Sequence, residues 1–266
     1  MRFLMLFFIL IFSVAASAGE IKGDWKFPSD IAVSSNKLYV VDGLNNRIAI
    51  YNFNGEHISD IEIDSPFGIY VDKKGFLYVT NQKGIVYVLD SLGNLKEKIN
   101  VSGRPIDIVK IGNRLFITNG KTNTIDVYSE DGKFIKRLGG KGSAPGYFVG
   151  PFMMDRSRNL IYVVDSINAR IQEFDKKGNF VRSFGVFGVE EGSLFRPKGV
   201  AFCNGNLVVT DGITGSLQLF NIYGAFEKVI TKNLYYPTAV ACYDKTVFVL
   251  EPLKNKVSTF KIQGVK

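Results

Sequence analysis

The sequence predicts an all-β chain of six repeated four-stranded units, and three observations lead to this prediction. Six of the eight prolines recur at spacings of 38, 39, 46, 46 and 40 residues. Short apolar runs rich in Val, Ile, Phe and Tyr follow these prolines, as expected for strands. A glycine suited to a hairpin turn recurs late in each unit. A period near 40 with β-type patterning indicates a six-bladed β-propeller of four-stranded antiparallel blades.

Each unit can be followed from its proline. A proline at the first residue of a strand removes no important ladder hydrogen bond, and the six are Pro28, Pro66, Pro105, Pro151, Pro197 and Pro237. The second strand of each unit is apolar, and the six are Leu38–Val41, Leu77–Thr80, Leu115–Thr118, Ile161–Val164, Leu207–Thr210 and Val247–Leu250. The glycines that follow the third strand are Gly55, Gly93, Gly132, Gly178, Gly224 and Gly264.

The sixth unit has no fourth strand after its turn glycine. The segment that begins Gly19-Glu20-Ile21 repeats the order of glycine, any residue and apolar residue that opens the fourth strand in other units. Trp25 and Phe27 then lead into Pro28. We therefore expect the N-terminal strand to complete the last blade, because an open ring would leave an unpaired edge.

Residues 1–18 have the pattern of a secretory signal peptide. Arg2 precedes the apolar run Phe3–Phe12, and Ala16-Ser17-Ala18 fits a cleavage site. The apolar segment is short for a membrane span, which needs about 20 residues. We expect cleavage after Ala18 and export of residues 19–266 as one propeller domain, periplasmic or extracellular, without a membrane span.

Two passages carry a family resemblance. Leu38–Asp42 and Leu160–Asp165 read Leu-Tyr-Val-Val-Asp and Leu-Ile-Tyr-Val-Val-Asp, and each is followed by an Asn and then Arg-Ile. With the Gly-rich linkers 139–150 and 185–195, these motifs resemble the NHL repeat. The resemblance implies a six-bladed propeller but no single activity, since such propellers include lyases, RNA binders and scaffolds. A single histidine, His57, gives little support to a His-dependent lyase.

Polar residues end the second strands, and they are the candidate metal ligands. They are Asp42, Asn81, Asn119, Asp165, Asp211 and Glu251. A ring of such oxygens suits Ca²⁺ or another divalent cation, which is the one cofactor that the sequence suggests. We favour a structural role, in which each side chain accepts hydrogen bonds from the turn that follows it. Arg47 and Arg170 follow their Asp by five residues, so each either braces this turn or faces a ligand.

Antiparallel strands place the proline corners, the second-strand ends and both Gly-rich linkers on one face. On this loop-rich face, Tyr147, Phe187 and Lys141 are the expected ligand-binding residues. Phe148 and Phe195 are expected to be buried between blades. We predict a non-catalytic propeller that binds an envelope protein, a peptide or an anionic glycan. The alternative is a divalent-metal-dependent lactonase or hydrolase at the channel mouth, so the sequence leaves enzymatic activity undecided.

The remaining signals are charge and cysteine. The net charge is +8, but lysines are spread over turns such as Lys73-Lys74, as is common for solubility. Export argues against nucleic acid as the partner, and we expect a monomer. Cys203 and Cys242 follow the first strands of adjacent units. An oxidising compartment permits a disulfide. Inner strands of neighbouring blades can, however, lie beyond the roughly 7 Å limit between Cα atoms, so the sequence does not decide whether these two cysteines form one.

Overall fold

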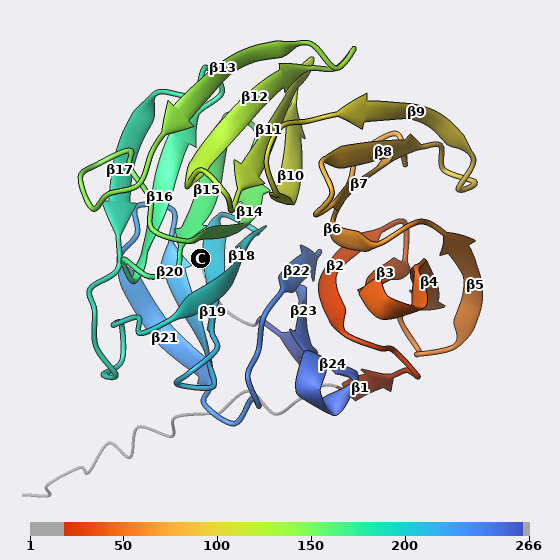
Figure 1. Cartoon of the computed structure of the whole chain (residues 1–266). Coiled ribbons are helices and arrows are strands. Elements are labelled where there is room, and N and C mark those ends of the chain that lie inside the picture. Colours follow the sequence, from red (N-terminus) through yellow and green to blue (C-terminus); the bar gives the residue numbers. More distant parts are fainter. Residues whose placement is uncertain (1–18, 263–266) are drawn as a thin grey trace, which may run out of the picture.

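The computed structural model describes residues 19–262 and consists of six four-stranded sheets around a central axis (Figure 1). Neighbouring strands in every sheet are antiparallel, and in the first five blades the chain runs from the axis outwards. The predicted fold class, an all-β six-bladed propeller, is therefore confirmed. The predicted signal peptide and the turn glycine Gly264 lie outside the described residues.

The strands follow the predicted units closely. Blades 1 to 3 contain β2 (Pro28–Ser34), β3 (Lys37–Asp42), β4 (Arg47–Asn52), β5 (His57–Glu62), β6 (Pro66–Val71), β7 (Leu77–Asn81), β8 (Ile85–Leu89), β9 (Leu95–Asn100), β10 (Pro105–Ile111), β11 (Arg114–Asn119), β12 (Thr124–Ser129) and β13 (Phe134–Gly139). Blades 4 and 5 contain β14 (Pro151–Arg156), β15 (Leu160–Asp165), β16 (Arg170–Asp175), β17 (Phe180–Phe184), β18 (Pro197–Cys203), β19 (Asn206–Asp211), β20 (Ser216–Asn221) and β21 (Phe226–Thr231).

The last blade is closed by the N-terminal strand, as predicted. It contains β22 (Val240–Tyr243), β23 (Thr246–Glu251), β24 (Lys256–Lys261) and β1 (Gly19–Lys22). β1 pairs antiparallel with β24, with Gly19 opposite Thr259 and Lys22 opposite Lys256. Single 3-10 turns, η1 (Gly43–Asn45) and η2 (Pro252–Lys254), follow the second strands of the first and last blades.

Five of the six recurring prolines begin the innermost strand of their blade, while in the last blade β22 begins three residues after Pro237. In those five blades the proline lies opposite the polar residue that ends the second strand, as Pro28 lies opposite Asp42. The pairing register then shifts directly after the proline in each of the five. Such a bulge redirects the side chain that follows the proline.

The hydrophobic core is divided into clusters that lie between adjacent blades. One joins the last blade to the first and contains Ile21 and Trp25, which are 3% and 2% exposed. The indole Nε1 of Trp25 donates a hydrogen bond to Tyr51 Oη at 3.1 Å. Closure of the ring therefore buries Ile21 and Trp25, as well as pairing β1 with β24.

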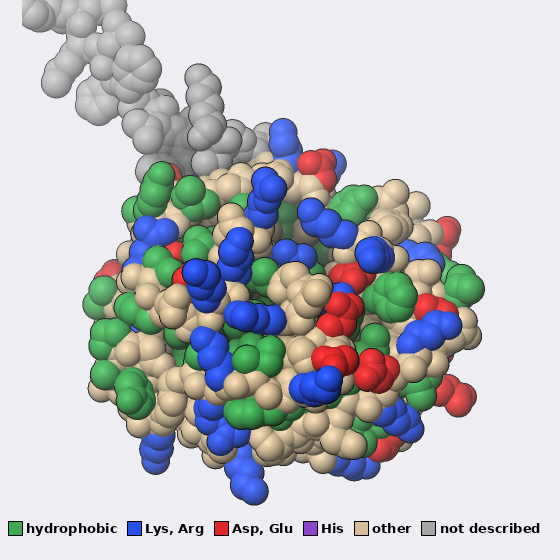
Figure 2. All heavy atoms as spheres, turned by 90° about the horizontal axis from the view of Figure 1, so that it is seen from above, with side chains coloured by type: hydrophobic (Ala, Val, Ile, Leu, Met, Phe, Trp, Pro, Cys, Tyr) green, Lys and Arg blue, Asp and Glu red, His purple; other side chains and the backbone are tan. Residues whose placement is uncertain are grey.

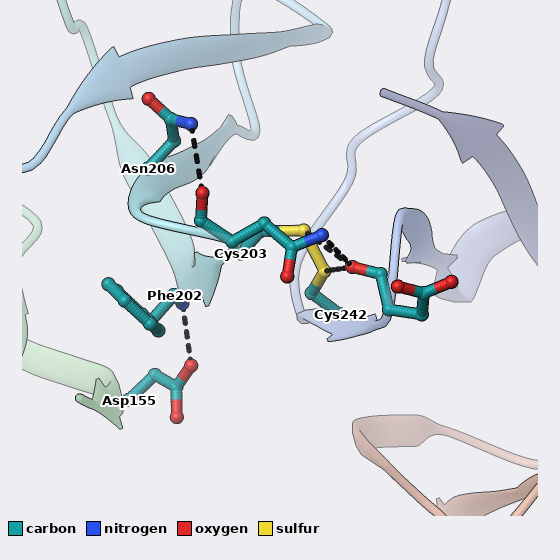
Figure 3. Close-up of a disulfide and its surroundings, with 7 residues drawn as sticks. Asp155, Phe202, Cys203, Asn206 and Cys242 are labelled. Carbon is teal, nitrogen blue, oxygen red and sulfur yellow. Dashed lines mark hydrogen bonds between the residues drawn. A yellow bond between two sulfur atoms is a disulfide. The ribbon is translucent and has the colours of Figure 1, made fainter. Parts of the chain in front are cut away.

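A disulfide between Cys203 of β18 and Cys242 of β22 links blades 5 and 6 (Figure 3). The two Cα atoms are 5.5 Å apart, within the range that a disulfide spans. The two inner strands are thus close enough for a disulfide, a question that the sequence left undecided. Among residues 19–262, no helix is long and apolar enough to cross a membrane.

Candidate functional site

The polar residues at the second-strand ends are buried, and their side chains bond to nearby loops. All six are at most 1% exposed. Asp42 accepts a hydrogen bond from the Lys26 amide at 2.7 Å, and Asp165 accepts one from the Val149 amide at 2.8 Å. Asp211 and Glu251 accept the corresponding bonds from the Phe195 and Tyr235 amides, both at 2.7 Å, and Asn119 accepts one from the Arg104 amide at 3.1 Å. Asn81 accepts bonds from the amides of Lys83 and Ile85. Five of the six therefore accept a bond from the segment just before their blade's proline, while Asn81 donates one to the Asp64 carbonyl there, at 3.4 Å, and accepts bonds from its own turn.

Arg47 and Arg170 are engaged in the same networks. Arg47 Nε lies 2.8 Å from the Asp42 carboxylate, and its other nitrogens contact Asp24 and Asp60. Arg170 Nε lies 2.8 Å from the Asp165 carboxylate, and its Nη2 donates to the carbonyls of Ala144 and Tyr147. Their donors brace the loops, so a ligand would have to displace these bonds.

The Gly-rich linkers carry the expected surface aromatics at the rim of the loop-rich face. Tyr147 is 48% exposed and Phe187 is 65% exposed, and Lys141 is exposed beside Tyr147. Phe148 is fully buried, as expected, but in the second linker the buried residue is Leu194 and Phe195 is only partly buried. The expectation for Phe195 was wrong by one residue, because Phe148 and Leu194 both stand three residues before their proline and Phe195 does not.

The largest cavity on this face, about 620 Å³, lies inside the rim and is built from the residues that flank the prolines. The residue after the proline lines it in all six blades: Ser29, Phe67, Ile106, Phe152, Lys198 and Thr238. The residue before the proline lines it in five blades: Phe27, Arg104, Gly150, Arg196 and Tyr236. We call this cavity the central pocket. Its volume is in the range of small-molecule sites.

Hydrogen bonds between blades fix the main chain of the pocket wall. The Ser29 hydroxyl donates to the Phe67 carbonyl at 2.6 Å. In the same way Thr80 donates to the Ile106 carbonyl and Thr118 to the Phe152 carbonyl, both at 2.9 Å. Thr210 likewise donates to the Thr238 carbonyl at 2.8 Å, so blades 1, 2, 3 and 5 each anchor the residue after the proline in the next blade. Together with the buried polar ends, these bonds hold both sides of the proline in four of the six blades before any ligand arrives.

The lining combines positive charge with apolar surface. Arg104, Arg196 and Lys198 line the pocket, and no Asp or Glu of the described chain is part of the lining. The rings of Phe67 and Phe152, from blades 2 and 4, meet edge to face with centroids 6.5 Å apart. Lys198 Nζ lies 4.9 Å from the centre of the Phe152 ring, a cation–π contact. Burial lowers the pKa of Lys198, and the nearby Arg196 guanidinium lowers it further.

Two hydroxyls in the pocket wall are buried without a hydrogen-bond partner in the described part of the chain. They are Ser166 Oγ and Thr238 Oγ1. Ser166 is 4% exposed and follows Asp165, the end of β15. A buried hydroxyl without a partner costs free energy of about 1–3 kcal/mol.

A second cavity, of about 120 Å³, is lined by the inner strands of all six blades. Asp30, Asp107 and Asp155 lie in it and bind amides of a following blade: Asp30 Oδ2 accepts from Ile69, Asp107 Oδ2 from Met154 and Asp155 Oδ2 from Phe202. Burial raises the pKa of Asp30 to about 7 and that of Asp155 to about 6. Burial, together with the charge of Asp30, also raises the pKa of Asp107. These carboxyl groups therefore join inner strands, and their burial disfavours the charged form.

His57 opens β5 and stands against the aromatic residue of the preceding strand. Its ring lies 5.3 Å from that of Tyr51, and its Nε2 lies 2.8 Å from Asp60 Oδ1. The same pairing of ring residues occurs between Tyr128 and Phe134 in blade 3. His57 thus takes the place of a packing aromatic on an outer strand. Within residues 19–262, no three His, Cys, Asp or Glu side chains are grouped so as to hold a metal ion.

Sequence reasoning did not identify Arg104, Arg196 and Lys198. It concentrated on the second-strand ends because those positions repeat in every unit, whereas the residues beside the prolines differ from blade to blade. The signal that could have found them was available: they flank recurring prolines on the face chosen for binding. Of the five residues expected at the ligand face, Tyr147, Phe187 and Lys141 are at the rim, Arg47 and Arg170 brace loops, and none lines the central pocket.

Comparison with known proteins agrees with this architecture. Residues 102–185 match the model of a family described as 6-bladed beta-propeller. Among solved structures, a streptogramin B lyase has a TM-score of 0.69 at 15% identity over 93% of this chain and 87% of its own. A catalytically inactive virginiamycin B lyase from Staphylococcus aureus with quinupristin has a TM-score of 0.67 at 16% identity, over 88% and 80% of the two chains.

A third similar structure is hydrazine synthase from Kuenenia stuttgartiensis, with a TM-score of 0.65 at 15% identity over 91% of this chain and 97% of that chain. Two lyases and a hydrazine synthase share one architecture, so the likeness shows the fold and no activity. The resemblance to NHL repeats stays a prediction. The blade count, the four-stranded sheets and these neighbours establish the chain as a six-bladed β-propeller.

Proposed function

We propose that this protein binds an anionic ligand with an apolar body in the central pocket, as an exported, non-catalytic propeller. The observation that carries the proposal is that Arg104, Arg196 and Lys198 line a mainly apolar cavity without a carboxylate among the described lining residues. Positive groups without neutralising partners favour an anion, and the Phe67 and Phe152 rings favour an apolar group beside it.

A peptide or protein that presents a carboxylate next to an apolar side chain satisfies both halves of this pocket. The net charge alone is less informative. On the side of the molecule in Figure 2, Lys and Arg side chains are distributed over much of the surface, while Asp and Glu gather right of the centre. Exposed lysines of that kind commonly serve solubility. The pocket differs because two of its cations, Arg196 and Lys198, are partly buried, and Lys198 lies against the Phe152 ring, where screening by solvent is weaker.

Calorimetric titration with N-acetyl-phenylalanine and with its amide tests the proposal. The acid carries the charge and the ring, and the amide lacks only the charge. A charge-assisted hydrogen bond contributes about 1.5–3 kcal/mol, so we expect the acid to bind at least about tenfold more tightly. Arg196→Gln should weaken binding of the acid, whereas Lys141→Gln, at the rim, should leave it unchanged. Equal affinity for acid and amide would contradict an anion site.

The metal-dependent lactonase or hydrolase remains a separate prediction. Its candidate oxygens, including Asp42, Asp165 and Asp211, accept bonds from their own loops at 2.7–2.8 Å. A cation at these positions would compete with the hydrogen bonds that hold the proline corners. The lyase solved with quinupristin was inactivated by replacing a histidine, and the one histidine here lies on an outer strand. Elemental analysis of the purified protein and a panel of lactones and esters test this alternative.

A further inference from the structure

Lys198 differs from the other cations of the central pocket. It is partly buried, and among the described residues no carboxylate lies within ion-pair distance of it and no hydrogen bond involves its amine. Its stem packs over Gly212, where an added Cβ would come within 3.1 Å of Lys198 Cγ. Lys110 and Lys256 are also partly buried, but each has a carboxylate partner, Glu130 and Glu251 respectively.

The surroundings of Lys198 disfavour its charged form. Burial, followed by the nearby Arg196 guanidinium, lowers the pKa of the amine, and together they outweigh the negative charge of Asp211, which acts in the opposite direction. Only the Phe152 ring stabilises the ammonium by direct contact, at 4.9 Å, and this is a modest interaction. A lysine in an apolar pocket beside another cation is a nucleophile toward carbonyl groups. Lys110, by contrast, has its pKa raised by bonds to Glu130 and Tyr78, despite its burial.

We propose that Lys198 captures a 2-oxo acid with an apolar side chain as a reversible imine in the central pocket. The inference deepens the proposed function and rests on it. The neutral amine of Lys198 attacks the carbonyl carbon, and a proton passes from nitrogen to oxygen to give a carbinolamine. The hydroxyl then leaves as water with the remaining proton of the nitrogen, and a carbon–nitrogen double bond forms. No oxidant or reductant is consumed, and addition of water reverses the capture.

Other groups of the pocket match the remaining parts of such a ligand. In a 2-oxo acid the carboxylate is adjacent to the carbonyl. The Arg196 guanidinium is close to Lys198, so it can bind the carboxylate while Lys198 reacts with the carbonyl. The apolar side chain suits the Phe67 and Phe152 rings. An aldehyde without an acid group would lack the guanidinium contact and is the poorer ligand.

Phenylpyruvate with sodium cyanoborohydride tests this inference at pH 7. The borohydride supplies hydride to the imine and makes the adduct permanent, and peptide mapping by mass spectrometry then locates it. We expect Lys198 to be labelled at least about tenfold faster than the exposed lysines, since each unit by which a pKa falls multiplies the neutral fraction about tenfold. Lys198→Arg retains the charge and should remove the adduct, whereas Lys141→Arg should leave it in place.

Phenyllactate separates this inference from the proposed function, because it has a hydroxyl in place of the carbonyl. Its binding, measured by calorimetry, depends only on the anion site. Binding of phenyllactate with no preferential labelling of Lys198 would overturn the imine and leave the anion site intact. Absence of phenyllactate binding would count against the proposed function itself. Labelling spread evenly over surface lysines, or unchanged in Lys198→Arg, would also overturn the assignment.

Discussion

Replacing Trp25 by alanine should weaken the closure of the ring. Trp25 is 2% exposed in the core between the last and first blades, and its indole bonds to Tyr51. Truncating a buried Trp costs about 3–5 kcal/mol in similar cores, against a typical total stability of about 5–15 kcal/mol. Each kcal/mol lowers Tm by about 2–4 °C in domains approaching this size. We therefore expect Tm to fall by roughly 10 °C.

Differential scanning calorimetry measures this effect, since the variant loses the single tryptophan that fluorescence would report. Phe27→Ala is the matched control: it lies two residues further on and is 63% exposed, so its loss should change Tm little. Deleting residues 19–26 should be more damaging than either substitution, because it also removes β1 and exposes the edge of β24. A Trp25→Ala protein that melts like the wild type would refute this account of closure.

Three further predictions concern the same chain. Replacing Cys203 and Cys242 together by serine should lower the free energy of unfolding by up to about 4 kcal/mol, the chain-entropy value for a bridge with a sequence separation of 39; an unchanged denaturant midpoint would contradict it. Asp30 and Asp155 have raised pKa values in the folded state. Their contribution to stability is therefore greatest below about pH 4 and is lost as pH rises through 6 and 7. Tm should fall between pH 5 and 8, and it should fall less steeply in Asp30→Asn. Mass spectrometry of exported protein should find Gly19 at the N-terminus, and an intact leader would refute cleavage.

The fold could be predicted because its determinants repeat. The proline recurs because the innermost strand begins there, and the following strand keeps its apolar run because packing between blades demands it. The missing strand was recognisable because Gly19–Ile21 repeats a local turn pattern. The disulfide was different: whether Cys203 and Cys242 approach to 5.5 Å depends on how two blades are spaced near the axis, which no local pattern encodes.

The site could be predicted only to the correct face. Repetition drew attention to residues such as Asp165, which hold loops in place, while the residues that make the central pocket distinctive occur once. Lys198 and Arg196 flank a proline in one blade, where other blades have residues such as Ser29 or Phe67. A functional pocket on a symmetric scaffold depends on departures from the repeat. The residues that line the pocket come together only in the closed ring, and no single unit contains them all.

A comparison of two variants shows whether the ligand binds in the central pocket or at the rim of the loop-rich face. Two triple variants are titrated with N-acetyl-phenylalanine, one carrying glutamine at Arg104, Arg196 and Lys198, the other replacing the rim residues Tyr147, Phe187 and Lys141. Both sets are at least partly exposed, so calorimetry should find each variant folded. The account predicts that the first variant loses binding and the second keeps the wild-type Kd. Binding that survives in the first and disappears in the second would place the site at the rim and contradict the account.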